Sequence, residues 1–181
     1  MRIIAGKYRR RIIKSAPSLK IRPTSDRLRE TLFNILTNKI DDGTFFLDLC
    51  AGTGAVGIEA LSRGAGFTTF VDKSRKACIL IEENLDLLQI PEEKTEVIRA
   101  DAAEYVKKTE RNFNLVFYDP PYRDNYLEVL SAIAFGKVLT EDGILVVEHE
   151  SKKDLPDSIG RIRRWRLIKQ GSSSLSFYEN R

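Results

Sequence analysis

Two different patterns of apolar and polar residues divide this chain of 181 residues. Before about residue 40, pairs of apolar residues stand among basic ones, whereas from residue 45 onward short apolar runs alternate with stretches long enough for a helix. Alternating strand and helix patterns are typical of β-α-β units, which build a mostly parallel sheet. We expect one α/β domain over residues 1–181, with a core at 41–181 and an N-terminal extension at 1–40.

The periodicity of the core predicts where its elements lie. Apolar runs that favour strands lie at residues 45–49, 67–71, 95–99, 113–118 and 143–148, and helices are expected at about 55–63, 75–89, 102–109 and 124–135. The end of the chain differs, because residues 162–169 and 175–178 are both strand-like and a serine-rich turn that begins at Gly171 separates them. These two segments predict a hairpin, which would bring the sheet to seven strands.

The N-terminal extension predicts a hairpin followed by a helix. Isoleucine pairs at residues 3–4 and 12–13 alternate with basic clusters between Gly6 and Pro17, which suits a short, appended hairpin. Pro23 and the helix-capping residue types at 24–26 then precede apolar residues at helical spacing through about Asn38. We expect one face of this helix to be apolar and the other basic.

The net charge of +4 is distributed unevenly. Residues 1–40 contain eleven Lys and Arg against two acids, and residues 161–169 contain five against none. Residues 170–181 are neutral, so residues 41–160, with thirteen basic and 23 acidic side chains, carry a net charge of −10. An acidic body with two basic segments favours a polyanionic partner, because clustered Lys and Arg neutralise phosphates. The candidate nucleic-acid contacts of the hairpin are Arg2, Lys7, Arg9, Arg10 and Arg11.

Simple counts disfavour several other classes of protein. No run of eighteen or more apolar residues is present and basic residues follow Met1 at once, so we expect a cytoplasmic protein without a membrane partner. Cys50 and Cys78 are too few and too far apart to predict a disulfide framework or a metal site, and we expect both to be reduced core residues. The single His149 stands at a predicted strand end, where we assign it no chemistry.

A glycine-rich loop joins the first predicted core strand to the helix after it. Between Leu47 and Gly57, the glycines at 52 and 54 lack the Cβ atoms that would keep a ligand away from the backbone, and they permit a sharp turn. Asp48 stands at the end of the strand, where its carboxylate could receive a cationic amine. The loop therefore predicts a cofactor site.

Two further acids follow the next two strands. Asp72 stands twenty residues after Gly52 and could hold the hydroxyls of an adenosine ribose, while Asp101 could accept a hydrogen bond from an adenine amino group. Acids at three successive strand ends favour one site, because ligands of open α/β sheets lie at the carboxyl edge. The match to Gly-x-Gly-x-x-Gly leaves both S-adenosylmethionine and an adenine dinucleotide open. The candidate cofactor-binding residues are Asp48, Ala51, Gly52, Thr53, Gly54, Asp72, Lys73, Asp101, Ala102 and Asp119.

The strand at 113–118 leads directly into Asp119-Pro120-Pro121-Tyr122, which are the candidate catalytic residues. The two prolines fix φ and have no N–H, so they hold the Asp119 carboxylate in a stiff turn. A conjugated amine is a poor nucleophile; Asp119 and the Pro120 carbonyl can accept its N–H groups, and Tyr122 can stack on an extruded base. The turn and the cofactor loop together predict in-line methyl transfer from S-adenosylmethionine to an exocyclic amine of a nucleic-acid base, with no metal.

Four blocks of the sequence resemble one family over nearly the whole chain. They are residues 1–8, residues 22–30 with Phe33, residues 48–54 continued through 59–65, and residues 119–122. On these residues the chain resembles the RsmD-type 16S ribosomal RNA guanine-N2 methyltransferases. The resemblance implies a class I, Rossmann-like methyltransferase fold with a seven-stranded, mostly parallel sheet, helices on both faces and a small basic hairpin for RNA.

The resemblance also implies a substrate and residue roles. The reaction would methylate N2 of guanosine 966 in 16S ribosomal RNA, within an assembling or assembled small subunit; a monomer is the default expectation. Asp48 and the two loop glycines would surround the methionine part of S-adenosylmethionine, with Asp72 at the ribose and Asp101 at the adenine. Arg22, Thr24 and Arg27 would lie near the cofactor and the RNA entrance.

Three other functions remain open. A DNA adenine-N6 methyltransferase uses the same four-residue motif on a similar amine, a nicotinamide-dependent oxidoreductase could use the glycine-rich loop, and an RNA-binding assembly factor could keep the fold without catalysis. The chain departs from the family at three places, because Arg10 replaces a common glycine, Cys50 a usual phenylalanine and Ser172 an acid that often follows Gly171.

Overall fold

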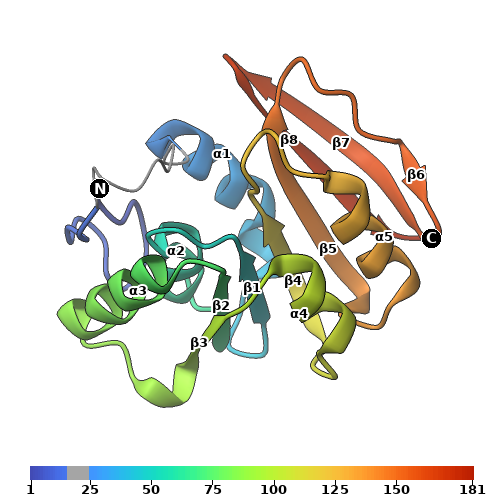
Figure 1. Cartoon of the computed structure of the whole chain (residues 1–181). Coiled ribbons are helices and arrows are strands. Elements are labelled where there is room, and N and C mark those ends of the chain that lie inside the picture. The colour runs from blue at the N-terminus through green and yellow to red at the C-terminus, as the bar shows by residue number, and fades with distance from the viewer. Residues whose placement is uncertain (16–24) are drawn as a thin grey trace.

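One central sheet organises the fold (Figure 1). The structure is a computed structural model, and it describes residues 1–15 and 25–181. The sheet has eight strands in the order β3-β2-β1-β4-β5-β8-β7-β6. The parallel part consists of β1 (Phe45–Leu49), β2 (Phe67–Asp72), β3 (Thr95–Arg99), β4 (Phe113–Tyr118) and β5 (Leu139–Glu150). The antiparallel part consists of β6 (Ser158–Ile159), β7 (Ile162–Gln170) and β8 (Ser173–Asn180).

The sheet has eight strands, one more than the seven expected from the sequence. The extra strand is β6, a two-residue segment that pairs with the outer edge of β7. No apolar run marks so short a strand, so the hydrophobic pattern does not predict it. β5 is also longer than expected, because Leu139 pairs with Phe113 before the register shifts to Ile144 beside Leu115.

The helices lie where the periodicity predicts them, within two residues at either end. Ser25 caps the first helix by accepting the Leu28 N–H at 3.1 Å. It is one of the helix-capping residue types at 24–26 that predict the start of this helix. None of the helices in the described part of the chain is long and apolar enough to cross a membrane. The helices are α1 (Asp26–Leu36), α2 (Ala55–Ser62), α3 (Arg75–Leu88), α4 (Ala102–Lys108) and α5 (Tyr126–Phe135), with short 3-10 turns at Thr37–Lys39 and Glu92–Lys94.

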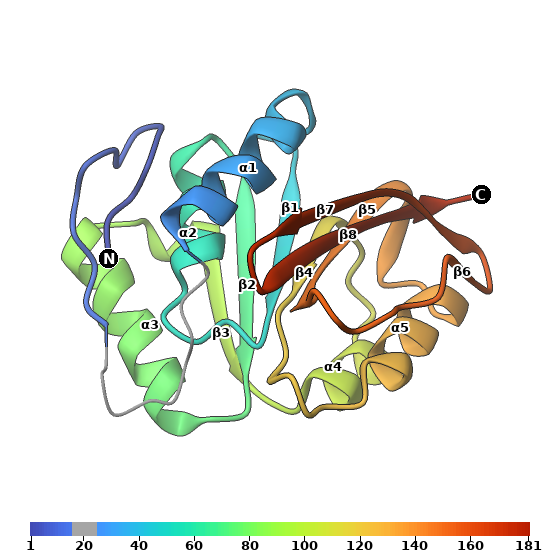
Figure 2. The same cartoon turned by 90° about the horizontal axis from the view of Figure 1, so that it is seen from above.

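Helices cover both faces of the sheet (Figure 2). α4 and α5 pack on one face, where Val106 and Leu130 join the strand residues of one apolar cluster. α1 and α2 pack on the other face around Leu32 and Phe46, and α3 extends that layer over β2 and β3. This three-layer arrangement confirms the predicted α/β class.

The strand order reverses between β1 and β4, and this reversal positions the site. The chain builds outward from β1 through β2 to β3 on one side, and from β4 to β5 on the other. Leu49 at the end of β1 lies beside Tyr118 at the end of β4, and the Asp119 N–H donates to the Leu49 carbonyl at 3.3 Å. A crevice for ligands is expected outside such a switch point.

The N-terminal segment is part of the packed fold, which corrects the expectation of an appended hairpin. It doubles back as predicted, with a single antiparallel bridge between Arg2 and Ile12. Ile3 and Ile13 are each 1 % exposed and pack with α2 and α3. The N–H groups of residues 4 and 5 donate to the buried Glu59 carboxylate of α2 at 2.8 and 3.0 Å. The basic surface of this segment is therefore held on a fixed frame.

Candidate functional site

A cavity of about 640 Å³ lies outside the carboxyl ends of the parallel strands. Sites for small molecules have volumes of about 300–1,000 Å³, so this cavity suits a ligand of that size. Its wall combines residues at the ends of β2, β4 and β5 with residues of the loops and helices that follow. The sequence-predicted residues on the wall are Gly52, Asp72, Lys73, Asp101, Ala102, Asp119, Pro120, Pro121 and Tyr122.

The loop after β1 turns tightly beside the cavity. Gly54 donates its N–H to the Ala51 carbonyl at 2.8 Å and has a left-handed φ of 76°, which favours glycine. A Cβ on Gly57 would lie 2.3 Å from Cε1 of Phe70, so glycine allows α2 to approach β2. The local fold thus explains the glycines at 54 and 57, and Gly52 is the loop glycine that stands on the cavity wall.

Asp48 lies inside the fold and not on the cavity wall. It is 2 % exposed, and its Oδ2 accepts the Gly57 N–H at 2.8 Å. Burial raises the pKa of Asp48 to about 8, because desolvation of the carboxylate outweighs this hydrogen bond. The structure does not place Asp48, Ala51, Thr53 or Gly54 on the wall where direct cofactor contact was expected; Asp48 instead ties β1 to the first turn of α2.

Backbone donors fix two acids on the cavity wall. Asp72 accepts the Gly52 N–H with Oδ2 at 3.0 Å and the Ser74 N–H with Oδ1 at 2.8 Å. Each carboxylate oxygen has two lone pairs, so Asp72 keeps the capacity to accept hydroxyl groups of a ligand. Asp101 caps α4, since its Oδ1 accepts two N–H groups of the first turn at 2.9 and 3.2 Å. A structural role and a ligand role are therefore compatible for both acids.

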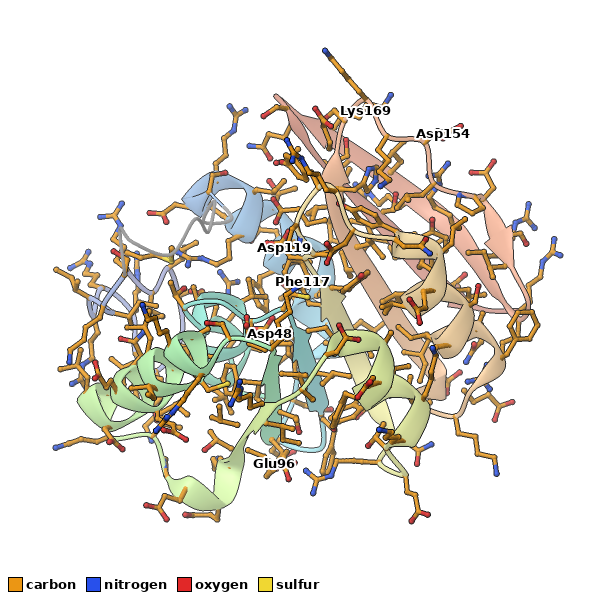
Figure 3. All side chains as sticks on the ribbon, viewed as in Figure 1. Asp48, Glu96, Phe117, Asp119, Asp154 and Lys169 are labelled. Atoms are coloured by element: carbon orange, nitrogen blue, oxygen red, sulfur yellow. The ribbon has the colours of Figure 1, made fainter. Side chains whose placement is uncertain are left out.

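The turn at residues 119–122 follows β4 and adjoins the loop after β1. Pro120 is buried, whereas Asp119 and Tyr122 are half-buried. The Tyr122 hydroxyl lies 3.1 Å from Oγ of Ser173, so strand β8 anchors the ring. Asp119 stands near the centre of the molecule at the end of β4 (Figure 3). The arrangement offers an acid and an aromatic ring to a planar group that enters the cavity.

Glu148 is a cavity residue that the sequence interpretation missed. It lies on β5 and is 4 % exposed. Tyr118 of β4 lies beside Val147 of β5, so the next residues, Asp119 and Glu148, come level with each other. A usable signal existed, because the rule that selects acids at strand ends applies to the fifth strand as well.

Asp124 and Glu128 complete an acidic wall. They belong to the loop and helix after the 119–122 turn, and no spacing in the sequence predicts that they face the cavity. The wall carries six acidic side chains and one basic one, Lys73. A cleft lined by one sign of charge attracts ligands of the opposite sign. This cavity therefore favours a cationic ligand that donates hydrogen bonds.

The basic residues predicted to contact nucleic acid have different places in the fold. Arg11 donates to two carbonyls at the end of α3, at 2.9 and 3.3 Å, and Arg2 lies 3.8 Å from Asp26. The Lys7 ammonium is 5.4 Å from the centre of the Tyr8 ring. Arg9, Arg10 and Arg27 are exposed, and Arg22 and Thr24 lie outside the described residues.

His149 and the cysteines have structural places. His149 is buried, its Nε2 lies 2.9 Å from Oγ of Ser176, and burial lowers its pKa. Cys50 and Cys78 are free thiols. Cys50 corrects the expectation of a core residue, because it stands on the cavity wall. Across residues 1–15 and 25–181, no group of three or more His, Cys, Asp or Glu is arranged to hold a metal ion.

The fold and the cavity identify the class of this protein. A parallel sheet that ends in an antiparallel hairpin, with a cavity lined by acids at its carboxyl edge and an Asp-Pro-Pro-Tyr turn beside them, is the arrangement of a class I methyltransferase that uses S-adenosylmethionine. This is the class that the sequence predicts. The oxidoreductase alternative leaves the 119–122 turn on the cavity wall without a role.

The chain belongs to the family described as "Conserved hypothetical protein 95", whose model matches residues 1–179. It is similar to YlbH of Bacillus subtilis, provisionally named as an rRNA methyltransferase, with 36% identity over 185 residues that span all of both chains. It is 34% identical to "Ribosomal RNA small subunit methyltransferase D" of Haemophilus influenzae, over 98% of this chain and 91% of that one. The solved structure of Escherichia coli yhhF, provisionally described as a methyltransferase, gives a TM-score of 0.89 at 31% identity and covers 99% of this chain and 97% of its own. These relatives confirm the resemblance to the RsmD family.

Proposed function

We propose that this protein transfers the methyl group of S-adenosylmethionine to the exocyclic N2 amine of a guanosine in 16S ribosomal RNA, at position 966 by family resemblance. The observation that carries this proposal is the shared cavity, because the acids after β2 and β3 and the 119–122 turn lie on one wall. Relatives named as ribosomal RNA methyltransferases support RNA as the substrate.

The residues of the cavity fit the cofactor in charge and hydrogen bonding. Asp72 would accept the ribose hydroxyls with the lone pairs that its backbone partners leave, and Asp101 would accept the adenine amino group through Oδ2. Gly52, Lys73 and Ala102 would form the wall beside them. The bound cofactor supplies a methyl group that is already activated on a positively charged sulfonium, and the acidic wall favours that charge.

The 119–122 turn would hold the target amine. The Asp119 carboxylate and the Pro120 carbonyl would accept its two N–H groups, which localises the nitrogen lone pair and offsets positive charge on the nitrogen. Tyr122 would stack on the base, with its ring fixed by the contact to Ser173. Pro121 has no N–H and keeps the turn stiff. These residues act by orientation and electrostatics, so no covalent intermediate with the protein is needed.

Glu148 favours guanine over adenine as the target base. Guanine presents two donors side by side on its Watson–Crick edge, N1–H and N2–H, whereas adenine presents the N1 acceptor beside its amine. With both N2–H groups accepted by the 119–122 turn, a second carboxylate can accept the guanine N1–H, whereas it repels the adenine N1 lone pair. Glu148 is buried on the cavity wall, level with Asp119. The pair of acids therefore supports guanine N2 against the adenine-N6 alternative.

The basic N-terminal residues would guide the RNA to the cavity. Phosphates would bind Arg2, Lys7, Arg9, Arg10, Arg11 and Arg27, and Arg22 and Thr24 belong to the same proposal. Residues 1–40 and 41–181 would act as one domain, and the protein would act as a monomer in the cytoplasm on an assembling or assembled small subunit.

The proposal is tested by comparing the wild type with Asp119→Asn on small ribosomal subunits that lack this modification. We expect the wild type to transfer labelled methyl groups and the variant to lose about 100-fold or more in kcat, because one acceptor that orients and stabilises the amine is removed. Calorimetry should show that cofactor binding weakens far less than kcat, because Asp119 is one of six acids on the cavity wall. Nucleoside analysis of the product should show N2-methylguanosine.

Asp154→Asn is the matched control, since Asp154 is exposed at the periphery of the molecule (Figure 3). It should retain full activity. Equal methyl transfer by the wild type and Asp119→Asn would overturn the catalytic role of Asp119. No transfer by the wild type would instead favour an assembly factor without catalysis. Transfer to duplex DNA with N6-methyladenine as the product would overturn the substrate.

A further inference from the structure

The face of β7 on the α1 side carries a basic and aromatic surface that the proposed active site does not use. Residues 161–169 contain five basic side chains and no acid. Two of them have partners within the protein: Arg161 donates to the Leu139 carbonyl at 3.1 Å, and Arg164 forms an ion pair with Asp157. The remaining three, Arg163, Arg166 and Lys169, are exposed.

A β-bulge brings an indole ring and a guanidinium to the same face of β7. Arg164 pairs with Tyr178 on β8 and Arg166 pairs with Phe177, so the extra residue, Trp165, shares the partner of Arg166. The ring centroids of Trp165 and Phe177 are 5.5 Å apart, and Phe177 packs in the apolar cluster between α1 and the sheet. Trp165 is nevertheless 41 % exposed. The bulge therefore presents Trp165 and Arg166 side by side on a rigid strand.

This surface leads toward the cavity. β7 runs in the same direction as β5, and its last residue, Gln170, pairs with Ser173, whose hydroxyl contacts Tyr122. Arg166 lies four residues earlier on β7, which corresponds to about 13 Å along the strand. Figure 1 shows β7 beside β8. A single-stranded segment whose base enters the cavity would pass this surface within a few nucleotides.

We propose that Arg163, Trp165 and Arg166 form a second RNA-binding surface, on which an unpaired base stacks on the indole and the flanking phosphates bind the guanidinium groups. The choice of RNA rests on the proposed function. A tryptophan ring with arginines on either side matches the combined stacking and charge recognition of single strands. Glu179 lies opposite Arg163 on β8 and reduces the local charge there, so Arg166 carries most of the attraction.

Intrinsic fluorescence gives a direct test, because Trp165 is the single tryptophan of the chain. The wild type is titrated with a short single-stranded oligoadenylate. Stacking of a base on Trp165 should quench its emission in a saturable way, and added salt should reverse the quenching. Unchanged emission at an RNA concentration that saturates binding of a labelled oligonucleotide would overturn the proposal, and an acidic protein partner would then be the candidate for this surface.

Variants test the separate contributions through the affinity for labelled oligoadenylate. Trp165→Ala should weaken binding roughly tenfold, and Trp165→Phe should restore most of the affinity because it keeps a ring. Arg166→Gln should weaken binding several-fold and lower the slope of log affinity against log salt by about 0.7. Glu179→Gln should strengthen binding, since it removes the acid opposite Arg163.

Lys137→Gln is the matched control. It removes an exposed charge just before the first residue of β5, whereas the cavity lies at the opposite, carboxyl ends of the strands. It should bind like the wild type, and wild-type affinity in both Trp165→Ala and Arg166→Gln would also overturn the proposal. The two proposals fail separately. Methyl transfer without quenching would support the proposed function and overturn the second RNA-binding surface. Quenching without methyl transfer would support the surface and overturn the proposed function.

Discussion

At the scale of single residues, the burial of Asp48 makes stability depend on pH. Its pKa rises from 3.8 to about 8 on folding, so the folded protein holds a proton that the unfolded chain releases between these values. The carboxyl group therefore favours the folded state most at low pH, and this contribution falls as the pH rises toward the folded pKa. The loss arises because the unfolded chain ionises in this pH range, whereas the folded state keeps the 2 % exposed carboxyl group protonated.

Asp48→Asn should have a flatter stability profile than the wild type. Asparagine can still accept the Gly57 N–H but does not ionise, so between about pH 5 and pH 8 the variant should lose a few kcal/mol less in its free energy of unfolding. Urea unfolding at both pH values measures this difference. Parallel profiles for wild type and variant would show that Asp48 keeps an ordinary pKa.

The same residue shows how far the sequence predicts the site. The 119–122 turn and the acids at 72 and 101 are predictable, because prolines and strand ends are local features. Asp48 is placed by the two-residue alternation of β1, which puts it with Phe46 on the face that α2 covers, opposite Leu47 and Leu49. The side on which α2 packs depends on contacts distant in the sequence, so the strand end alone does not show where the carboxylate points.

At the scale of elements, Glu59 fixes the N-terminal segment to α2. Its side chain is fully buried and accepts two backbone N–H groups of the segment and the Arg63 Nε, the latter at 2.8 Å. A glutamine at this position would offer a single neutral amide oxygen, which cannot accept from all three of these donors as the two carboxylate oxygens do. Removal of one partner of a buried ion pair costs about 3–5 kcal/mol.

Glu59→Gln should therefore lower the melting temperature and release the segment. Trypsin should cleave the variant faster after Arg9 and Arg10, which are exposed at the turn of the segment. Glu83→Gln is the matched control, because the Lys14–Glu83 pair is about half exposed and should contribute less than about 1 kcal/mol. Equal cleavage rates in wild type and Glu59→Gln would refute the fixing role.

The elements differ in how well the sequence predicts them. The core helices and strands follow from apolar periods near 3.6 and 2, which each element shows by itself. The two-residue β6 and the bulge at Trp165 depend on pairing with β7 and β8, and no local pattern marks them. The docking of the first fifteen residues depends on Glu59, about fifty residues away, so the sequence predicts a hairpin but not its attachment.

At the scale of the whole molecule, charge separates the surface proposed for RNA from the cavity proposed for the cofactor. The basic segments at 1–40 and 161–169 flank a body of net charge −10, and the cavity wall holds six acids against one lysine. Phosphates are therefore attracted to the periphery and repelled from the cavity, which a neutral base can still enter. The same field favours the sulfonium form of the cofactor over its thioether product, which has one positive charge fewer.

This field predicts that salt changes the affinities for the two cofactor forms unequally. Screening shortens the range of the attraction from about 10 Å at 0.1 M salt to about 3 Å at 1 M, so the preference for S-adenosylmethionine over S-adenosylhomocysteine should fall several-fold across that range in calorimetry. Asp124→Asn should reduce the preference at low salt, because Asp124 lies on the wall, whereas Glu93→Gln, exposed just before β3, should not. Equal salt dependence for both ligands would mean that local contacts alone distinguish them, and the acidic wall would then have no part in cofactor selection.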